Sequence, residues 1–284
     1  MEIQSVGNMT KCMRDGVEFL TFPIFAPWTF VRHAFSTRIG GVSENEFASM
    51  NLSFRRGDPD ENVMENYRRF CGAAGFDPET LVSSAQVHHT VIRRVGRENC
   101  GEGFTKPKSA AGVDGLITNE PGVTLVTHYA DCVPLFLLDT RNRAIGLVHS
   151  GWRGTAAKIG LAAVKAMHRE FGTRPGDLVA GIGPSIGPCC FEVDAPVRDV
   201  FAGMSELQPE ELITDDGNGK YHIDLWEANR RILSQAGLPD EHIAVAKLCT
   251  ECNADWLFSH RASGGKRGGL AAFMSLTKEG RHGN

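Results

Sequence analysis

The chain has 284 residues, of which 42% are hydrophobic and 23% are charged. This composition is typical of a globular protein that buries a sizeable core, and it excludes the collagen-like, disordered and disulfide-scaffold classes. The formal net charge of −4 gives no reason to expect nucleic acid or an anionic membrane as a partner. A small-molecule substrate is therefore the first expectation.

The sequence favours a cytoplasmic location. Eight cysteines are spread through a mid-sized chain, which favours reduced thiols or metal ligands over a disulfide framework. The apolar stretch 17–30 is interrupted by Glu18, Pro23 and Pro27 and no cleavage motif follows it, so we expect no signal peptide. No run reaches the ~18 apolar residues of a membrane span, and we expect no membrane partner.

The first half of the chain is expected to hold strands and one well-marked helix. A strand pattern at Phe30–Phe35 precedes residues 58–61 (Asp-Pro-Asp-Glu), which resemble a helix capping box. Apolar residues follow at helical spacing as far as Gly75, and glycine is typical of a helix end. Further strands are predicted at Leu81–Val87 and Val91–Val95.

The second half alternates strands with two more helices. An alanine-rich helix is expected over Thr155–Phe171, and another begins at Asp224, which with Glu227 repeats the capping pattern. Apolar runs predict strands at Thr124–Thr127, Val133–Leu138, Ala144–His149, Leu178–Ile182, Ile243–Leu248 and Leu270–Leu276. Many strands and few helices, without an internal repeat, indicate one α/β domain over residues 1–284, with large mixed sheets covered by helices on their outer faces.

The strands at 133–138 and 144–149 form a predicted hairpin, because a short polar turn separates two apolar runs. If Leu138 pairs with Arg143, Cys132 lies directly opposite His149 on one face of the sheet. Opposite residues have Cβ atoms roughly 4.5–5.5 Å apart, which suits two ligands of one metal or a thiolate–imidazolium pair. Taken alone, Cys132 and His149 are each as consistent with a place in the apolar core as with a functional role. The predicted pairing of the two favours a functional site.

A third candidate ligand comes from the segment 86–90. Its adjacent histidines, His88 and His89, face opposite sides of a strand, so only one of them joins a given site, and His128 is a further candidate. Two histidines and one cysteine with an open fourth position are typical of catalytic zinc. A thiolate with imidazoles argues against magnesium or calcium.

The remaining motifs give weaker indications. A C-x-x-C lies at 249–252, and without a second such motif we expect it to have a structural role. The vicinal cysteines at 189–190 follow a Gly/Pro turn and are expected to be packing or turn residues rather than ligands. The Gly-x-Gly at 181–183 lacks the third glycine of a dinucleotide fingerprint, so no Rossmann site is expected.

Five strings in order resemble the laccase-domain (YfiH-type) family, whose members have been labelled polyphenol oxidase, purine nucleoside phosphorylase and peptidoglycan editing factor. They are HAFSTRIGGVS at 33–43, QVH at 86–88, ADCVP at 130–134, HSGWRG at 149–154 and GIGPSIGPCCFEV at 181–193. The resemblance extends to about Leu276. One departure is Gly-Lys-Arg at 265–267, which replaces the family's usual Thr-Gly-Arg and puts a role for Arg267 in doubt.

The resemblance implies an α/β (α+β) fold, namely a four-layer α/β/β/α sandwich with mixed sheets. It also implies a zinc site whose ligands map onto His88, Cys132 and His149, which selects His88 over His89; copper is the alternative metal. These three residues are also the candidate catalytic residues, together with Asp131. The Asp131 carboxylate would position a ligand or act as a base, or it would cap a turn.

If phosphate is a substrate, arginines are the expected residues to bind it, because a guanidinium group binds phosphate in a bidentate way. Arg38 lies in a glycine-rich loop, and Arg153 lies close to the proposed ligand His149. Arg261 lies in a C-terminal segment that fits the family. The alternative for each is a solvated or carboxylate-paired arginine.

Three functions are consistent with these residues. The first, implied by the resemblance, is zinc-dependent phosphorolysis of adenosine, inosine or guanosine to free base and ribose 1-phosphate, extended to adenosine deamination and methylthioadenosine phosphorolysis. The second is a Cys/His hydrolase that edits peptidoglycan precursors, with Cys132 as nucleophile and His149 as base. The third is copper-dependent polyphenol oxidation. Multicopper oxidases need clustered histidines, and the ten histidines here are scattered without a His-x-His, which disfavours this third function.

Overall fold

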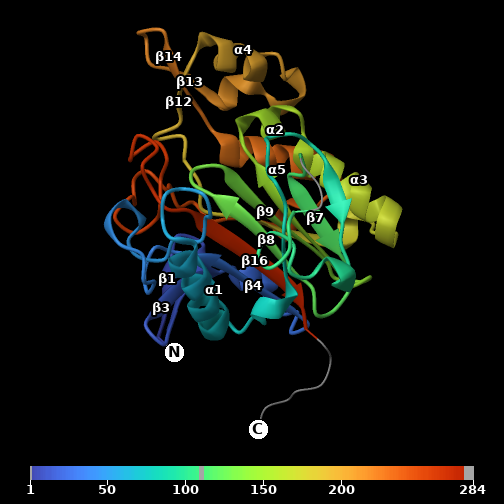
Figure 1. Cartoon of the computed structure of the whole chain (residues 1–284). Helices are drawn as coiled ribbons and strands as arrows, with labels where there is room; N and C mark the ends of the chain where they lie inside the picture. The colour runs from blue at the N-terminus through green and yellow to red at the C-terminus, as the bar shows by residue number, and fades with distance from the viewer. Residues whose placement is uncertain (1, 109–111, 278–284) are drawn as a thin grey trace.

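The computed structural model describes residues 2–108 and 112–277 (Figure 1). Within these residues, two large sheets pack face to face and a smaller sheet lies at one end. An apolar core fills the space between the large sheets, with Phe35, Leu125, Phe136 and Leu147 among its fully buried members. None of the described helices has both the length and the apolar character that crossing a membrane requires.

The first large sheet combines the N-terminal strands with strands from the middle and the end of the chain. Its strands are antiparallel to their neighbours except for the last, which is parallel to β8. In sheet order they are β1 (Glu2–Val6), β2 (Met9–Arg14), β3 (Val17–Thr21), β4 (Val31–Ser36), β16 (Leu270–Leu276), β8 (Thr124–Tyr129) and β5 (Leu81–Ser83).

One helix, α1 (Asp60–Ala74), covers the outer face of this sheet. Its Phe70 ring stacks on Phe273 of β16 with ring centroids 4.5 Å apart. The helix ends as expected at Gly75, whose φ of 78° is the left-handed conformation that glycine adopts without strain. The predicted capping box is wrong, because the Asp58 carboxylate accepts hydrogen bonds from Ser43 Oγ (2.6 Å) and Asn51 Nδ2 (2.8 Å) instead of capping the helix.

The second large sheet holds the predicted hairpin at its centre. Its strands in order are β15 (Ile243–Val245), β11 (Leu178–Ile182), β9 (Val133–Asp139), β10 (Ala144–Ser150), β7 (Gly115–Thr118) and β6 (Ile92–Arg94). The helices α2 (Trp152–Ala156), α3 (Ile159–Phe171) and α5 (Leu225–Gln235) cover its outer face. The four layers are therefore helix, sheet, sheet, helix, and the expected α/β/β/α sandwich with mixed sheets is confirmed.

The helix predicted over 155–171 is in fact two helices. The chain enters α2 directly from the end of β10, and α2 ends at Ala156. Lys158 has a φ of 56°, in the left-handed region, so an α-helix cannot continue through it. This break turns the chain into α3, which ends before Gly172 as expected.

The third sheet was not predicted from the sequence. It contains β12 (Glu192–Asp194), β14 (Lys220–Ile223) and β13 (Ile213–Asp215), and α4 (Ala195–Ala202) packs on it. Short 3₁₀ turns connect the elements of the fold at Pro23–Phe25, Asn45–Phe47, Pro78–Thr80, Arg97–Asn99, Pro175–Asp177, Ser205–Leu207, Pro209–Glu211 and Asp240–His242.

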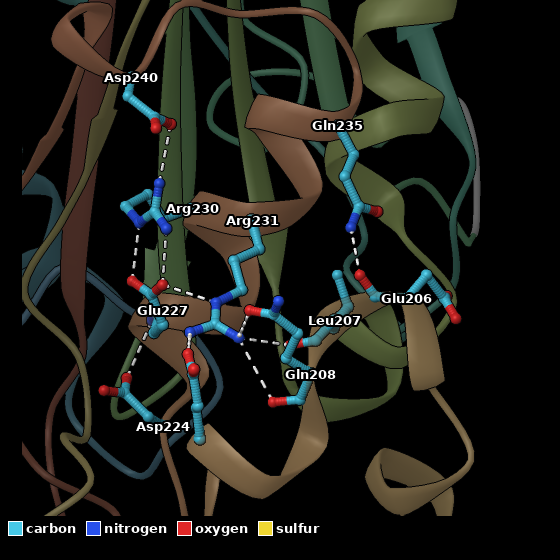
Figure 2. Close-up of polar contacts among 10 residues, drawn as sticks. Glu206, Leu207, Gln208, Asp224, Glu227, Arg230, Arg231, Gln235 and Asp240 are labelled. Atoms are coloured by element: carbon cyan, nitrogen blue, oxygen red, sulfur yellow. Dashed lines mark hydrogen bonds and ion pairs between the residues drawn. The ribbon is translucent and has the colours of Figure 1, made fainter.

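Helix α5 fixes the segment that joins α4 to β13, as Figure 2 shows. Asp224 caps the helix as predicted, since its Oδ1 accepts from the Glu227 N–H at 2.9 Å. Arg231 reaches from the helix to the carbonyl oxygen of Leu207 at 2.7 Å, and Arg230 donates to both Glu227 and Asp240.

The hairpin of β9 and β10 has a different register from the predicted one. Asp139 pairs with Ala144 and Leu138 with Ile145, so the pairing is shifted by two residues and His149 lies opposite Pro134. The turn begins after Asp139 because its carboxylate accepts the N–H groups of residues 141 and 142, at 2.9 and 2.8 Å. Side chains alternate between the two faces of a strand, so a shift of two keeps Cys132 and His149 on the same face as diagonal rather than direct neighbours.

Candidate functional site

Three side chains from separate segments converge at one end of the hairpin. His88 follows β5, Cys132 directly precedes β9, and His149 lies near the end of β10. One potential ligand atom from each lies within 4.8 Å of the other two. Gly151 makes room for them, because a Cβ atom there would lie 2.5 Å from His88 Nδ1 and 3.1 Å from Cys132 Sγ.

Asp114, the residue before β7, holds two of these residues in place. Its Oδ1 lies 2.9 Å from His149 Nδ1 and accepts the backbone N–H of His88 at 2.9 Å. Its Oδ2 accepts the N–H groups of Val87 (3.2 Å) and His89 (2.8 Å). With Nδ1 of His149 bound to a carboxylate, its Nε2 is free to face a metal, as in many histidine metal sites.

Sequence reasoning missed Asp114. The available signal was an acidic residue between Val113 and Gly115 in an apolar segment, since a buried carboxylate needs partners. Burial raises the pKa of Asp114, but the hydrogen bonds from His149 and the backbone outweigh this effect and leave the pKa below its ordinary value.

The charges of the cluster favour a thiolate beside an imidazolium. Burial raises the pKa of Cys132, but the charge of His149 and hydrogen bonds from both histidines lower it to about 6. Burial lowers the pKa of His149, but the Cys132 thiolate and Asp114 raise it to about 9. A deprotonated thiol is the form that binds a metal or attacks a substrate.

The other two candidate histidines lie outside the cluster. His89 is exposed, and only its backbone is held by Asp114. The Nε2 atom of His128 lies 2.7 Å from the hydroxyl of Tyr67, and burial lowers the pKa of His128 to about 3. The geometry therefore brings together the three residues that the family resemblance implied.

A cavity of about 1090 Å³ opens beside the cluster, and all three of its residues line it. Basic side chains form much of the remaining wall: Arg55, Arg56, Lys106, Lys108 and Arg267. Arg267 is only 8% exposed, and its Nε has no hydrogen-bond partner among the described residues. Burial, together with the nearby charge of Arg56, lowers the pKa of Arg267 to about 10. Guanidinium and ammonium groups gathered in this way suit an anionic ligand.

Asp131 and Arg261 brace a loop beside the cluster and do not line the cavity. The Asp131 carboxylate accepts from Thr250 Oγ1 at 2.6 Å and from the Arg261 backbone N–H at 2.7 Å. The Arg261 guanidinium donates to the carbonyl oxygens of Cys190 (3.2 Å) and Glu192 (3.0 Å). Both residues thus act on the position of the turn that carries Cys132.

Arg38 and Arg153 also lie away from the large cavity. Arg38 donates to the carbonyl oxygens of Ala48 (2.7 Å) and Ala254 (2.8 Å), and it lines a separate cavity of about 250 Å³. Arg153 is exposed on α2, and its guanidinium lies 4.2 Å from the centre of the Trp152 ring. The structure therefore brings neither arginine to the cluster.

The fold and the site together define a class: two facing mixed sheets with a His–Cys–His cluster beside a basic cavity. The family model described as multi-copper polyphenol oxidoreductase laccase matches residues 32–277, and the chain belongs to this family. A crystal structure of a hypothetical protein YfiH from Bacillus licheniformis superposes with a TM-score of 0.88 at 32% identity, covering 94% of this chain and 99% of that one. The resemblance to the laccase-domain (YfiH-type) family is thus confirmed.

Curated relatives carry two kinds of name. A protein named purine nucleoside phosphorylase YlmD from Geobacillus stearothermophilus is 38% identical over 247 residues, which cover 86% of this chain and 89% of that protein. A purine nucleoside phosphorylase from Bacteroides thetaiotaomicron is 36% identical over 260 residues, covering 91% and 96%. A protein named adenosine deaminase RL5, from an unknown prokaryotic organism, is 32% identical over 233 residues, covering 81% and 88%.

Proposed function

We propose that this protein is a zinc-dependent purine nucleoside phosphorylase, which converts adenosine, inosine or guanosine and phosphate to the free base and ribose 1-phosphate. The observation that carries the proposal is the basic cavity beside the cluster of His88, Cys132 and His149. The names of the relatives support the same reaction class. The eight free cysteines support a cytoplasmic location for it.

The donor set fits zinc. Two imidazoles and one thiolate that leave a fourth position open are the composition of a catalytic zinc site, and Asp114 supplies the carboxylate that orients His149. When bound, zinc supplies a Lewis acid that stabilises negative charge on a substrate. Imidazole and thiolate also suit copper, which is the alternative metal.

The basic side chains of the cavity would bind phosphate. Burial lowers the pKa of Arg267, and the charge of Arg56 lowers it further. Burial also lowers the pKa of Lys108, with a further contribution from the charge of Arg55. These shifts mean that the cations repel one another in a partly desolvated space. A bound phosphate relieves that repulsion, and Arg267 offers it a free Nε–H donor.

Aromatic side chains on the same cavity suit the purine ring. Phe54 and Phe104 both line it, with ring centroids 6.4 Å apart, and Phe54 stacks on Tyr67. Aromatic faces bind flat heterocycles through dispersion and offset stacking. The cavity thus offers an apolar wall for the base and a basic wall for phosphate.

The experiment is to incubate metal-quantified protein with inosine or adenosine, with and without phosphate, and to identify the products by chromatography. Free base that forms only with phosphate supports the proposal, and base released equally without phosphate contradicts it. Cys132→Ala and His149→Ala should lose the zinc of the His88–Cys132–His149 cluster and the activity together. Cys100→Ala is a matched control, because Cys100 is outside both thiol-containing clusters of the described residues.

Two extensions of the reaction, deamination and methylthioadenosine phosphorolysis, are tested in the same assay, and the oxidase alternative is tested separately. Ammonia release from adenosine would add the deaminase activity that one relative's name carries. Methylthioadenosine in place of adenosine tests whether a 5′-thioether is accepted. Protein loaded with copper and given a phenol tests the oxidase reading of the family's description.

A Cys/His hydrolase that edits peptidoglycan precursors is the second candidate, and the pKa of Cys132, lowered to about 6, favours it. A thiolate at neutral pH is a competent nucleophile, and His149 is its neighbouring acid and base. A zinc-bound thiolate is blocked from attack. Zinc bound at the His88–Cys132–His149 cluster of active protein therefore counts against this function, and amide hydrolysis by protein without that zinc would establish it.

A further inference from the structure

Four cysteines from two distant segments converge outside the candidate active site. Cys189 and Cys190 follow β11, and Cys249 and Cys252 follow β15. Their four Sγ atoms all lie within 4.8 Å of one another, and all four thiols are free. The Sγ of Cys252 is 3.4 Å from that of Cys189 and 3.4 Å from that of Cys190. The sequence did not predict this pairing of a vicinal motif with a C-x-x-C.

The spacing of these sulfur atoms fits a metal ion. Zinc binds thiolates at about 2.3 Å, so a tetrahedral four-cysteine site places its sulfurs about 3.8 Å apart. A disulfide needs about 2.05 Å, and Cys252 is equally close to two partners, so no single cysteine pair is singled out for a bond. Four thiolates with no oxygen donor are the ligand set of zinc rather than of magnesium or calcium.

The backbone around the cluster supports thiolate charge on one of its members, Cys249. The N–H of Gly187 donates to Cys249 Sγ at 3.3 Å, and the backbone N–H of Cys252 donates to the same sulfur. Hydrogen bonds of this kind stabilise and orient metal-bound thiolates. A side chain at position 187 would place its Cβ 2.7 Å from the Trp226 ring and 3.3 Å from Cys189 Sγ, so glycine is needed for this approach.

The two loops are also joined directly. Ser185 donates its N–H to the carbonyl oxygen of Leu248 at 3.2 Å, and Thr250 donates back to Ser185 O at 3.0 Å. The indole N–H of Trp226 donates to Ser185 Oγ at 2.7 Å. The four cysteines therefore lie where two loops are hydrogen-bonded to each other and to α5. A structural metal at this place would link the same two loops.

We propose that Cys189, Cys190, Cys249 and Cys252 bind one structural Zn²⁺ ion, at a site separate from the His88–Cys132–His149 cluster. The thiol protons pass to solvent as the thiolates bind, and all four coordination positions are filled by sulfur, so the site takes no substrate. This proposal stands independently of the proposed function.

The role of this zinc would be to hold the turn that carries Cys132. Thr250 lies inside the C-x-x-C and donates its hydroxyl to the carboxylate of Asp131, the residue before Cys132. Arg261 joins the same carboxylate, through its N–H, to the carbonyl oxygen of Cys190. Both halves of the four-cysteine cluster are therefore connected to Asp131.

The test is zinc stoichiometry in protein purified with its metals and measured by atomic spectrometry. We expect about two zinc ions per chain in the unchanged protein and about one in Cys132→Ala. Cys252→Ser and Cys190→Ser should each also retain about one, and Cys132→Ala combined with Cys252→Ser should retain almost none. Cys100→Ser, outside both clusters, should keep the full content. A Cys132→Ala protein that holds no zinc overturns the proposal.

A second measurement uses the unchanged chain and needs no variant to fold. Cys189 and Cys252 are exposed, so iodoacetamide reaches them if they are free thiols, and chelator-treated protein gives the alkylation rate of the free thiols. We expect mass spectrometry to find all four cysteines protected until a zinc chelator is added. Prompt alkylation of zinc-replete protein, or a mass lower by two hydrogens that shows a disulfide in this cluster, contradicts the proposal. In cobalt-loaded Cys132→Ala, thiolate-to-cobalt absorption should appear, and it should disappear when Cys252→Ser is added to that variant.

Discussion

Asp114 holds the imidazole of His149 through its Oδ1, 2.9 Å from Nδ1, and the same aspartate offers its backbone carbonyl oxygen to the His149 N–H at 2.7 Å. One residue thus fixes both the tautomer and the backbone of a candidate ligand. The same carboxylate gathers three successive N–H groups, from Val87, His88 and His89, so it also sets the position of the exposed His88.

Asp114→Asn should weaken zinc binding at the His88–Cys132–His149 cluster by about 10–100-fold, the usual effect of losing an outer carboxylate. An amide has an NH₂ group that must face some of the N–H groups that the carboxylate accepts. Competition with a chelator measures the affinity. Asp139→Asn is the control, since Asp139 is also fully buried and accepts backbone N–H groups but lies in the hairpin turn. Equal losses of zinc in both variants would mean that Asp114 acts only through stability.

Arg267→Gln should raise the KM for phosphate by about 10–100-fold, because a charge-assisted hydrogen bond is worth about 1.5–3 kcal/mol. The KM for inosine should change far less. Arg38→Gln is the comparison: its guanidinium is held by two carbonyl oxygens, so its loss should lower the melting temperature and leave the KM for phosphate unchanged. The reverse pattern would assign phosphate to Arg38.

Thr250→Val should lower the stability of the protein by about 1–3 kcal/mol, because valine has the shape of threonine but leaves the Asp131 carboxylate without a buried donor. Thr250→Ser keeps the hydroxyl and should restore most of the loss. Urea unfolding measures both. If valine and serine destabilise equally, the hydrogen bond to Asp131 is not what Thr250 contributes.

His33 makes the fold sensitive to acid. Burial lowers its pKa to about 3, and its Nε2 accepts the N–H of Phe22 at 2.7 Å while its ring packs against Phe25 and Phe136. Below pH 6.5 the unfolded chain gains a proton at this histidine that the folded chain does not. Stability is therefore fully present above about pH 6.5 and falls as the pH drops towards 3, by up to about 1.4 kcal/mol per pH unit.

His33→Gln provides the check on that acid sensitivity, because its amide oxygen can accept the same N–H and does not titrate. Urea unfolding at several pH values should give a shallower slope for this variant between pH 6 and 4. An unchanged slope would assign the acid sensitivity to other groups.

Local patterns predicted much of the fold. Each of the nine expected strands is present, because the alternation of apolar residues and the turn residues act over a few positions. Two of them end several residues early: β5, expected over 81–87, ends at Ser83, and β15, expected over 243–248, ends at Val245. The short strands of the third sheet escaped prediction because exposed, charged segments such as Glu192–Asp194 have no apolar signature. The hairpin register was wrong by two residues because the side chain of Asp139, not strand propensity, sets where the turn begins.

Part of the candidate site could also be predicted from local sequence patterns. Cys132 and His149 were found because they flank one hairpin, and an even error in register leaves two residues on the same face. Asp114 was missed because it reaches the site from an element that is distant in sequence, and Arg267 was left in doubt because Gly-Lys-Arg replaces the family's usual Thr-Gly-Arg. The convergence of Cys190 with Cys252, which are 62 residues apart, depends on the crossing of loops after β11 and β15 and cannot be read from spacing.

The cavity wall is built mainly from connecting segments, whereas the large apolar core lies between the sheets. Arg55, Arg56 and Lys108 are exposed cavity residues in loops, so substitutions there change what the cavity accepts and leave the interior packing intact. Because the cavity wall and the apolar core are built from different residues, members of the family can change substrate by single substitutions that leave the stability of the fold unchanged. The presence of both phosphorylase and deaminase names among relatives of similar identity is what a scaffold with this freedom would produce.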